Sequence, residues 1–263
     1  MWVGVATHKN TLGVLALVGA IFLLWDLLDL KRKSEKGVGK YLTISKVVVL
    51  LLCWYLLVIA NSATSLVCAI LGSSMLLILN LPSVSQGFRR VEAFGLWGIA
   101  LFVTLDSLFN VKELVVTDLL GRDMTLTTRT DVWPILLTYQ DNPLVGAGFN
   151  SFWAGERLVK LFESVGGIIQ AHNGYIETYL NGGFVGVGLL LVVLLATYLR
   201  IRKRLLLQLS DANIRLVVLT LAVIYNNSEA SFNKVGMMWF VTLYALMEYR
   251  AQLHPATPLV RIQ

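Results

Sequence analysis

The chain has 263 residues, of which 56% are hydrophobic and only 14% are charged. Soluble globular domains carry about a quarter charged residues, so this composition excludes an ordinary soluble domain. The formal net charge of +6 is better explained by the basic cytoplasmic loops of a membrane protein than by nucleic-acid binding.

Seven apolar segments are predicted to be transmembrane helices, because each is long enough to approach the ~30 Å hydrocarbon core. They cover residues 11–30, 44–60, 64–80, 92–108, 182–199, 213–227 and 235–249. The short turn Asn61-Ser62-Ala63-Thr64 joins the second and third into a hairpin. A long polar stretch, 109–181, separates the fourth from the fifth. The sequence therefore predicts an all-α, polytopic membrane helix bundle, a single domain over 1–263 with one long, partly helical loop.

Basic residues gather at alternate connections between these segments. They are Lys31, Arg32, Lys33, Lys36, Lys40, Arg89, Arg90, Arg200, Arg202, Lys203, Arg204 and Arg250. The positive-inside rule makes these connections cytoplasmic and places the loop 109–181 and the N-terminus in the periplasm or outside. No signal peptide is visible. An outer N-terminus with no span ahead of it predicts a fragment of a longer protein, truncated at its N-terminus.

The long loop contains most of the candidate functional residues. Trp133 to Tyr139 is predicted to form a short helix, ended by the turn Asp141-Asn142-Pro143. Gly146 and Gly148 indicate tight backbone geometry or close approach to a ligand. No His, Asp and Glu cluster with metal-ligand spacing occurs in this loop, and Cys53 and Cys68 lie in predicted spans as packing residues.

Histidine and arginine are the side chains here that suit transfer chemistry. His8 and His172 lie on the predicted outer side, and His254 lies in the predicted cytoplasmic tail. A neutral imidazole accepts a proton near neutral pH because its unperturbed pKa is ~6.5. A guanidinium binds phosphate oxygens in pairs and is always charged. The alternatives are a solvated histidine, a surface arginine and, for Trp133, an anchor at the membrane interface.

Several short motifs follow one another along the chain. They are Arg-x-x-x-Trp at 129–133, Asn-Pro-Leu-x-Gly-x-Gly at 142–148, Ala-His-Asn-x-Tyr-x-Glu at 171–177 and Gly-Gly-x-x-Gly at 182–186. With the opening His8-Lys9-Asn10 and the later Ser228-Glu229, they resemble the O-antigen ligase and O-antigen polymerase family, including exopolysaccharide polymerases of the succinoglycan type. The resemblance covers essentially the whole chain.

The resemblance implies a membrane glycosyltransferase of the GT-C class in the bacterial cytoplasmic membrane. Such an enzyme passes glycan from an undecaprenyl-pyrophosphate donor to an acceptor hydroxyl at the outer face, inverts the anomeric centre and needs no metal or other cofactor. Polymerases use another lipid-linked repeat unit as acceptor, and ligases use lipid A-core. The His8-Lys9-Asn10 opening favours a polymerase. Membrane lipid and other polysaccharide assembly proteins are the further partners expected.

The resemblance also implies roles for individual residues. His172 would be the general base, and Arg129 would bind the pyrophosphate and offset the charge of the leaving group. Arg122 and Arg157, which belong to none of the motifs, are reserve candidates for a second phosphate contact. The remaining predicted substrate-binding residues are His8, Lys9, Trp133, Asn142, Gly146, Gly148, Asn173, Tyr175 and Glu177.

The chain departs from the family pattern at the hairpin turn. Many polymerases carry Ser-Lys-Thr or Ser-Arg-Thr where this chain reads Ser62-Ala63-Thr64, so either another basic residue substitutes or the activity is weakened or lost. Two other classes stay open. A transporter would place ionisable residues at mid-span, whereas Asp26, Asp29 and Asp106 lie toward span ends. An inactive partner of a polysaccharide assembly complex is the third hypothesis.

Overall fold

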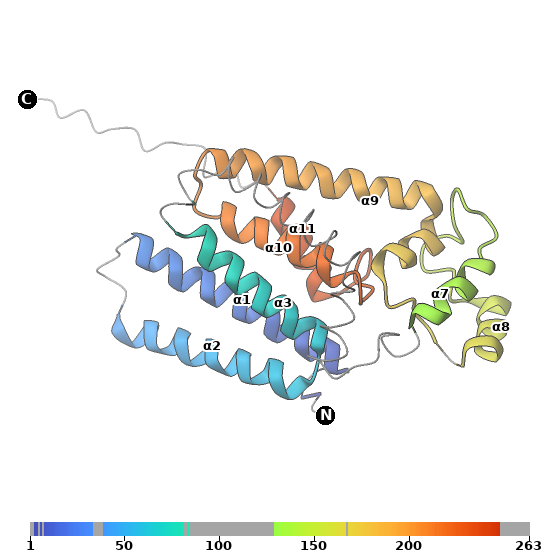
Figure 1. Ribbon diagram of the computed structural model, residues 1–263, viewed down its shortest axis with the longest axis horizontal. Coiled ribbons are helices and arrows are strands. Elements are labelled where there is room, and N and C mark those ends of the chain that lie inside the picture. Colours follow the sequence, from blue (N-terminus) through green and yellow to red (C-terminus); the bar gives the residue numbers. More distant parts are fainter. Residues whose placement is uncertain are drawn as a thin grey trace, which may run out of the picture.

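We describe the fold from a computed structural model, in residues 3–4, 6, 8–33, 39–81, 84, 129–166 and 168–247. Every regular element in these ranges is an α-helix (Figure 1). The helices are α1 (Lys9–Lys33), α2 (Lys40–Ala60), α3 (Ala63–Leu79), α7 (Arg129–Thr138), α8 (Gly155–Val165), α9 (Gly174–Leu206), α10 (Ala212–Tyr225) and α11 (Met237–Leu246). The all-α prediction is confirmed for this part of the chain. The predicted span 92–108, with Arg89, Arg90, Asp106 and Arg122, lies outside the described residues.

Apolar helices occupy the other six predicted spans. Three are long and apolar enough to cross a membrane: Lys9–Leu30 of α1, then α2 and α9. The apolar helices α3, α10 and α11 are shorter. Helix α9 starts at Gly174 rather than at residue 182, because the Asn173 side chain caps it by accepting the amide hydrogens of Tyr175 and Ile176. The end of the predicted loop is therefore the first part of a helix.

The apolar helices pack into one bundle. Helix α1 packs against α2 and α3, and α10 packs against α3, α9 and α11. Leu17, Leu57, Leu76 and Val217 are fully buried between them. A Cβ at Gly72 would lie 2.7 Å from Ile21 Cδ1, so α3 approaches α1 as closely as a small residue permits. Small residues at helix contacts are typical of membrane bundles.

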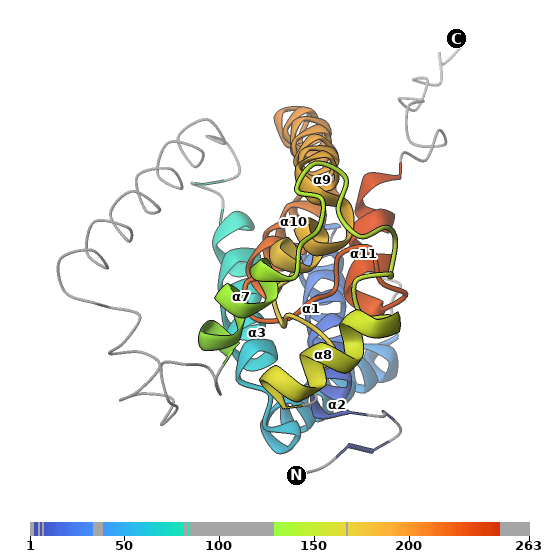
Figure 2. The ribbon, with the colours of Figure 1, turned by 90° about the vertical axis from the view of Figure 1, so that its right-hand side faces the viewer.

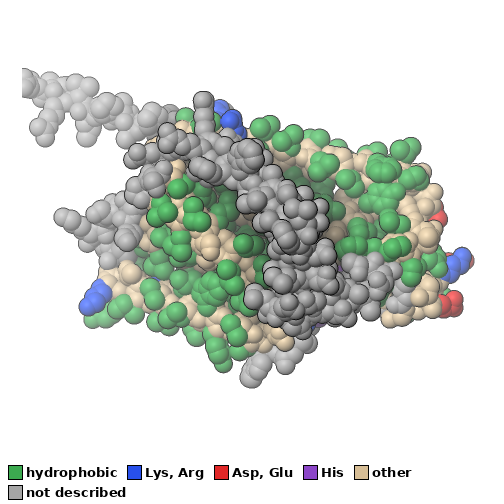
Figure 3. Space-filling view, viewed as in Figure 1, with side chains coloured by type: hydrophobic (Ala, Val, Ile, Leu, Met, Phe, Trp, Pro, Cys, Tyr) green, Lys and Arg blue, Asp and Glu red, His purple; other side chains and the backbone are tan. Residues whose placement is uncertain are grey.

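The outer sides of the bundle are apolar. Exposed apolar side chains occur on α2 and α9, among them Leu51, Tyr55, Leu189, Val192 and Leu195. Figure 3 shows apolar side chains over the long side of the molecule and the visible charged ones toward its ends. Contiguous exposed apolar surface on a folded chain marks contact with a membrane or a partner, and its length along the helices suits lipid.

The short helices α7 and α8 lie together at one end of the bundle (Figure 2). The start of α1, the α2–α3 turn and the segment after α10 meet at this same end, since Asn10 contacts Glu229 and Thr64 contacts Ser228. The connections predicted to be outside thus share one end of the bundle. The sidedness of that end relative to the membrane remains a prediction.

At the opposite end of the bundle, a carboxylate between two arginines joins neighbouring helices. Asp211, between α9 and α10, accepts hydrogen bonds from Arg204 at 2.7 Å and from Arg215 at 2.6 Å. Burial raises the pKa of Asp211, but the hydrogen bonds and charges of the two arginines outweigh it and hold this pKa below its usual value. Arg215 also donates to the carbonyl oxygens of Ala245 and Met247. The cluster therefore ties α9, α10 and α11 together.

Lys46 of α2 and Asp26 of α1 form an ion pair at 2.6 Å. Lys46 lies in the first turns of α2, and Asp26 lies in the second half of α1. The pair therefore links these helices near the end opposite to α7 and α8. Asp26 was predicted to lie toward the end of a span, and its pairing with Lys46 was not predicted.

Candidate active site

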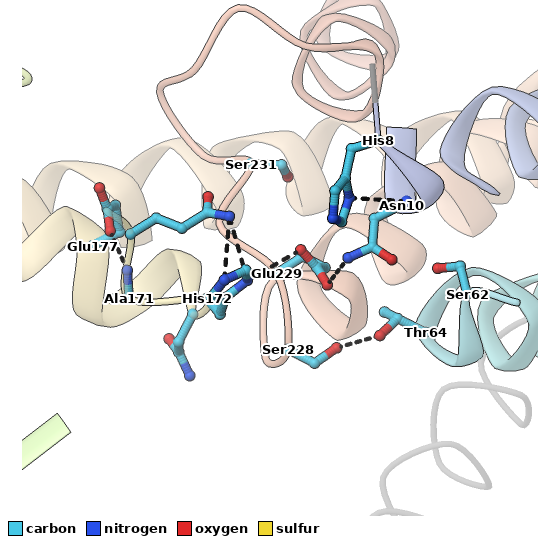
Figure 4. A network of polar contacts seen from close by, with 12 residues as sticks. His8, Asn10, Ser62, Thr64, Ala171, His172, Glu177, Ser228, Glu229 and Ser231 are labelled. Carbon is cyan, nitrogen blue, oxygen red and sulfur yellow. Dashed lines mark hydrogen bonds and ion pairs between the residues drawn. The ribbon is translucent and has the colours of Figure 1, made fainter. Parts of the chain in front are cut away.

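Three polar residues from distant parts of the chain meet at the α7–α8 end of the bundle (Figure 4). His172 Nδ1 lies 3.6 Å from Glu229 Oε2. The other oxygen, Oε1, accepts a hydrogen bond of 2.6 Å from the side-chain amide of Asn10. We call Asn10, His172 and Glu229 the histidine cluster. The side chains of His172 and Glu229 are mostly buried, with 24% and 10% of their surfaces exposed.

The backbone holds the His172 ring toward Glu229. His172 has a φ of 51°, in the left-handed region that residues other than glycine seldom adopt. It lies one residue before Asn173, the cap of α9. The preceding residue, Ala171, donates its amide hydrogen to Glu177 Oε2 at 2.9 Å. The turn is thus fixed on both sides of His172, and strained backbone that is held in this way is characteristic of functional sites.

Glu177 is a buried carboxylate with several partners. Only 4% of the residue is exposed. Besides Ala171, it accepts a hydrogen bond from Trp153 Nε1 at 2.7 Å and lies 3.3 Å from Lys234 Nζ. Its place in the first turn of α9 is also favourable for a negative charge. Glu177 therefore joins the loop, the start of α9 and the segment after α10.

Trp133 ties α7 to the histidine turn. Its indole Nε1 donates a hydrogen bond of 2.9 Å to the carbonyl oxygen of Ala171. Val132 and Leu136 of α7 are buried against Phe152 and Leu161 in a small apolar core of their own. Helix α7 is consequently a fixed part of the site rather than a loose segment beside it.

The turn that carries Glu229 is built around Asn226, which is completely buried. Its Oδ1 accepts the amide hydrogens of Ser231 and Phe232 at 2.8 and 3.0 Å. Its carbonyl oxygen accepts the amide hydrogen of Gly174 at 2.8 Å. A Cβ at Gly174 would lie 2.1 Å from Asn226 Oδ1, so this position requires glycine.

Two further motif residues reach the same end of α10. Asn173 Nδ2 donates to the carbonyl oxygen of Asn227 at 3.2 Å, and the Tyr175 hydroxyl donates to that of Val223 at 2.9 Å. The start of α9 and the end of α10 are thereby joined, which sets the separation of His172 from Glu229.

The glycine motifs at 142–148 and 182–186 form a single structure, which we call the loop–helix junction. Helix α9 is kinked at Gly183, where φ is 59° and ψ is −160°. The amides of Phe184 and Val185 donate instead to the carbonyl oxygens of Pro143 and Leu144, at 2.8 and 2.9 Å. The loop therefore takes over hydrogen bonds that a straight helix would make internally.

The junction also bonds in the other direction. The amides of Ala147 and Gly148 donate to the carbonyl oxygens of Leu180 and Asn181, at 3.0 and 2.9 Å. A Cβ at Gly146 would lie 2.4 Å from the backbone carbon of Asn181. Of the two alternatives predicted for Gly146, the structure shows tight backbone geometry, because its α carbon packs against the backbone of α9.

A family model described as O-antigen ligase matches residues 1–191, more than half of the chain. The chain belongs to the O-antigen ligase family. Its apolar helices agree with an integral membrane protein. The suggested resemblance is confirmed.

One curated relative of this O-antigen ligase family member is an exopolysaccharide production protein, ExoQ, of Rhizobium meliloti (strain 1021). The two are 29% identical over 222 residues, which make up 78% of this chain and 48% of the relative. The chain thus spans about half the length of the relative it matches. The family match includes His172 but ends before Glu229, its partner in the fold.

The other predicted site residues of the O-antigen ligase chain occupy varied places. Asn142 builds its own turn, with Oδ1 accepting the amides of Leu144 and Val145. Arg157 pairs with Asp141 and lies 5.1 Å from the centre of the Phe152 ring. Its charge is thus already partnered.

The remaining predicted site residues lie at the starts of α1 and α7. His8 Nδ1 accepts the amide hydrogen of Asn10 at 3.2 Å, and Lys9 begins α1. Arg129 begins α7, but its side chain lies outside the described residues. His8 therefore adjoins the histidine cluster, while the predicted role of Arg129 stays a prediction.

Sequence reasoning did not assign Glu229 or Asn10 to the site. Glu229 is the only acidic residue between α10 and α11, in the connection 226–236. A single carboxylate in a predicted outer turn is a usable signal, because most of that turn consists of asparagine, serine and small residues. Its pairing with His172 depends on the tertiary fold.

Proposed function

We propose that this chain carries the catalytic part of a membrane glycosyltransferase that polymerises polysaccharide repeat units. In this proposal the donor is linked to undecaprenyl pyrophosphate, and transfer occurs at the outer face of the bacterial cytoplasmic membrane. The observation that supports it is the histidine cluster, in which a carboxylate faces the imidazole of His172. Family membership favours transfer of a glycan, and the similarity to an exopolysaccharide production protein favours polymerisation.

The cluster suits general-base catalysis. The 3.6 Å between His172 Nδ1 and Glu229 Oε2 is longer than a hydrogen bond, and such contacts commonly tighten when substrate binds. A carboxylate at Nδ1 favours the tautomer with the proton on Nδ1, which leaves Nε2 able to accept a proton. Glu229 then stabilises the imidazolium that forms.

The proposed reaction is a single displacement. The acceptor hydroxyl gives its proton to His172 Nε2 while its oxygen bonds to the anomeric carbon of the donor. The bond from that carbon to the pyrophosphate oxygen breaks, the lipid pyrophosphate leaves, and the anomeric centre inverts. Arg129 would bind the pyrophosphate and stabilise its developing charge. Metal independence belongs to the same proposal.

The placement of the cluster agrees with this chemistry. It lies at one end of an apolar bundle, where a lipid-linked donor can keep its isoprenoid chain in the membrane and present its headgroup. The proposal includes the GT-C relationship, about seven spans and the outer location of the α7–α8 end.

Complementation of a polymerase-deficient strain tests the proposal. The full-length protein is expressed as wild type, His172→Asn and Arg129→Ala, and polysaccharide length is measured on a gel after membrane levels are matched. Asparagine is chosen at position 172 because it tolerates a positive φ and has no basic nitrogen. Both variants should reduce long-chain polymer by about 10²-fold or more.

Matched controls are His254→Asn and Arg200→Ala, which lie in the predicted cytoplasmic tail and at the other end of α9. Both should make polymer at the wild-type level. Wild-type levels of polymer from His172→Asn would overturn the proposed role of this residue. A product attached to lipid A-core instead of polymer would identify a ligase.

A further inference from the structure

A second polar site lies on the other side of the histidine turn from Glu229. It is a pocket open to solvent between the loop, the first part of α9 and the segment after α10. Its polar and aromatic lining includes Phe149, Asn150, Glu177, Asn181, Asn233 and Lys234. We call it the Glu177 pocket. None of the histidine cluster lines it, and the general-base mechanism does not use it.

The mouth of the pocket exposes an aromatic ring and two amides. Phe149 is a large apolar side chain, yet 76% of it is exposed. Asn150 and Asn233 are also exposed, and among the described residues neither side chain has a hydrogen-bond partner. Both have positive φ, 54° and 58°. The backbone thus holds an aromatic face and two unused amides around one opening.

The charges in the pocket balance. Lys234 Nζ lies 3.3 Å from Glu177 Oε1, so one cation faces one anion. Glu177 already accepts from Trp153 and Ala171. A lining of this kind has no net attraction for a strongly charged ligand. The pocket offers a few hydrogen-bond donors and acceptors beside apolar surface, which is typical of sites for small neutral molecules.

A sugar ring has the matching chemistry. Its hydroxyl groups both donate and accept hydrogen bonds, as an asparagine amide does through its NH₂ and its oxygen. Its C–H face is apolar and packs on an aromatic ring such as Phe149. We propose that the Glu177 pocket binds a neutral hexose ring of the glycan, next to the sugar that reacts at His172. This inference rests on the proposed function.

Glu177 connects this pocket to the histidine turn. The carboxylate that lines the pocket accepts the amide hydrogen of Ala171, the residue immediately before His172. Figure 4 shows Glu177 and Ala171 side by side, with His172 between them and Glu229. A ring in the pocket therefore lies beside the carboxylate that accepts the Ala171 amide, and neighbouring sugars of one glycan would lie along the turn.

Binding and kinetics of the full-length protein in lipid nanodiscs test this inference. The probe is the lipid-free oligosaccharide repeat unit released from the polymer of the same strain, and binding is followed by saturation-transfer NMR. The pocket variants are Phe149→Ala and Asn233→Gly. Their controls are Phe162→Ala, an exposed phenylalanine on α8, and Gln208→Gly, an exposed residue with φ of 56° at the other end of the bundle.

Each pocket variant should weaken probe binding by about five- to tenfold, the effect of removing one contact of ordinary strength. The controls should bind as wild type does. In transfer assays KM should rise while kcat stays near the wild-type value. A rise in KM for the lipid-free or lipid-linked acceptor assigns the pocket to the acceptor glycan, and a rise for the donor assigns it to the donor glycan.

Failure of this inference differs from failure of the proposed function. Unchanged binding in both pocket variants, or no binding by wild type, overturns the pocket even if His172→Asn abolishes transfer. Weaker binding in both variants supports the pocket even if the wild-type protein transfers no sugar, which would instead count against the transferase.

Discussion

Phe184 donates its amide hydrogen to the carbonyl oxygen of Pro143 at a distance of 2.8 Å. This bond replaces an internal bond of α9 at its kink and fastens the first part of the helix to the loop. The first part of α9 begins directly after Asn173, the residue that follows His172, so the loop–helix junction and the histidine turn lie at the two ends of one short helical segment. The two glycine motifs are thus joined to each other through the backbone.

Gly146→Ala should destabilise the protein by about 2–4 kcal/mol, because a Cβ there meets the α9 backbone in addition to the strain of a positive φ. Thermal unfolding in detergent measures the change. Gly155→Ala is the matched control, since Gly155 has φ of 65° but open space around its Cβ. The control should lose only about 1–2 kcal/mol. Equal losses at the two positions would show that the junction is not tightly packed.

Glu229→Gln should lower kcat by about 10²-fold or more while the protein stays folded. The amide oxygen can still accept from Asn10, but the NH₂ group then faces His172 Nδ1 and favours the tautomer whose Nε2 carries the proton. A transfer assay with purified protein measures the loss. Glu163→Gln on the exposed face of α8 should have no effect. A fully active Glu229→Gln enzyme would exclude Glu229 as the partner of the base.

Trp133→Phe separates two roles of this residue. If Trp133 were a platform for a sugar, phenylalanine would retain most of the activity. The structure instead shows its indole nitrogen bonded to Ala171, so we expect a stability loss of about 1 kcal/mol and a lower kcat with KM unchanged. Thermal unfolding and steady-state kinetics measure both effects. Wild-type values of both kcat and KM would favour the platform.

Asp211→Asn should destabilise the end of the bundle opposite to the histidine cluster by about 3 kcal/mol at pH 7, because two arginines lose their carboxylate. The folded-state pKa of Asp211 is lowered, so its stabilisation is complete above the unfolded value of about 3.9 and disappears as the pH falls through the folded value. The difference from wild type should therefore shrink below about pH 4.

Thermal unfolding as a function of pH measures this difference. Asp141→Asn is the control, since 77% of the Asp141 side chain is exposed and exposed ion pairs contribute little. A difference between Asp211→Asn and wild type that stays constant down to pH 3 would contradict the assignment.

Local composition was enough to predict the apolar helices, because a membrane span depends mainly on an uninterrupted apolar run. Six of the predicted spans coincide with described helices. The true start of α9 was missed because Gly174 to Asn181 is polar for a span, although Asn173 is an N-cap signal. The short helix near Trp133 was predicted, and it begins at Arg129.

Pairings across the chain could not be predicted from the sequence. His172 was selected as a base, but its neighbour Glu229 comes from a turn that Asn226 shapes through buried hydrogen bonds. For Gly146 and Gly148 the sequence left two alternatives, tight backbone geometry or close approach to a ligand. The tertiary structure shows that Gly146 packs tightly against the backbone of α9.

The three residues of the histidine cluster are far apart in the sequence, so they are synthesised at different times. Asn10 emerges from the ribosome first, His172 much later, and Glu229 only after α10. A nascent chain that has inserted α1 to α9 therefore still lacks the carboxylate that faces His172. His172 therefore meets Glu229 only when the α10–α11 hairpin docks, and under the proposed mechanism a chain that has inserted no further than α9 would have no carboxylate to orient its base.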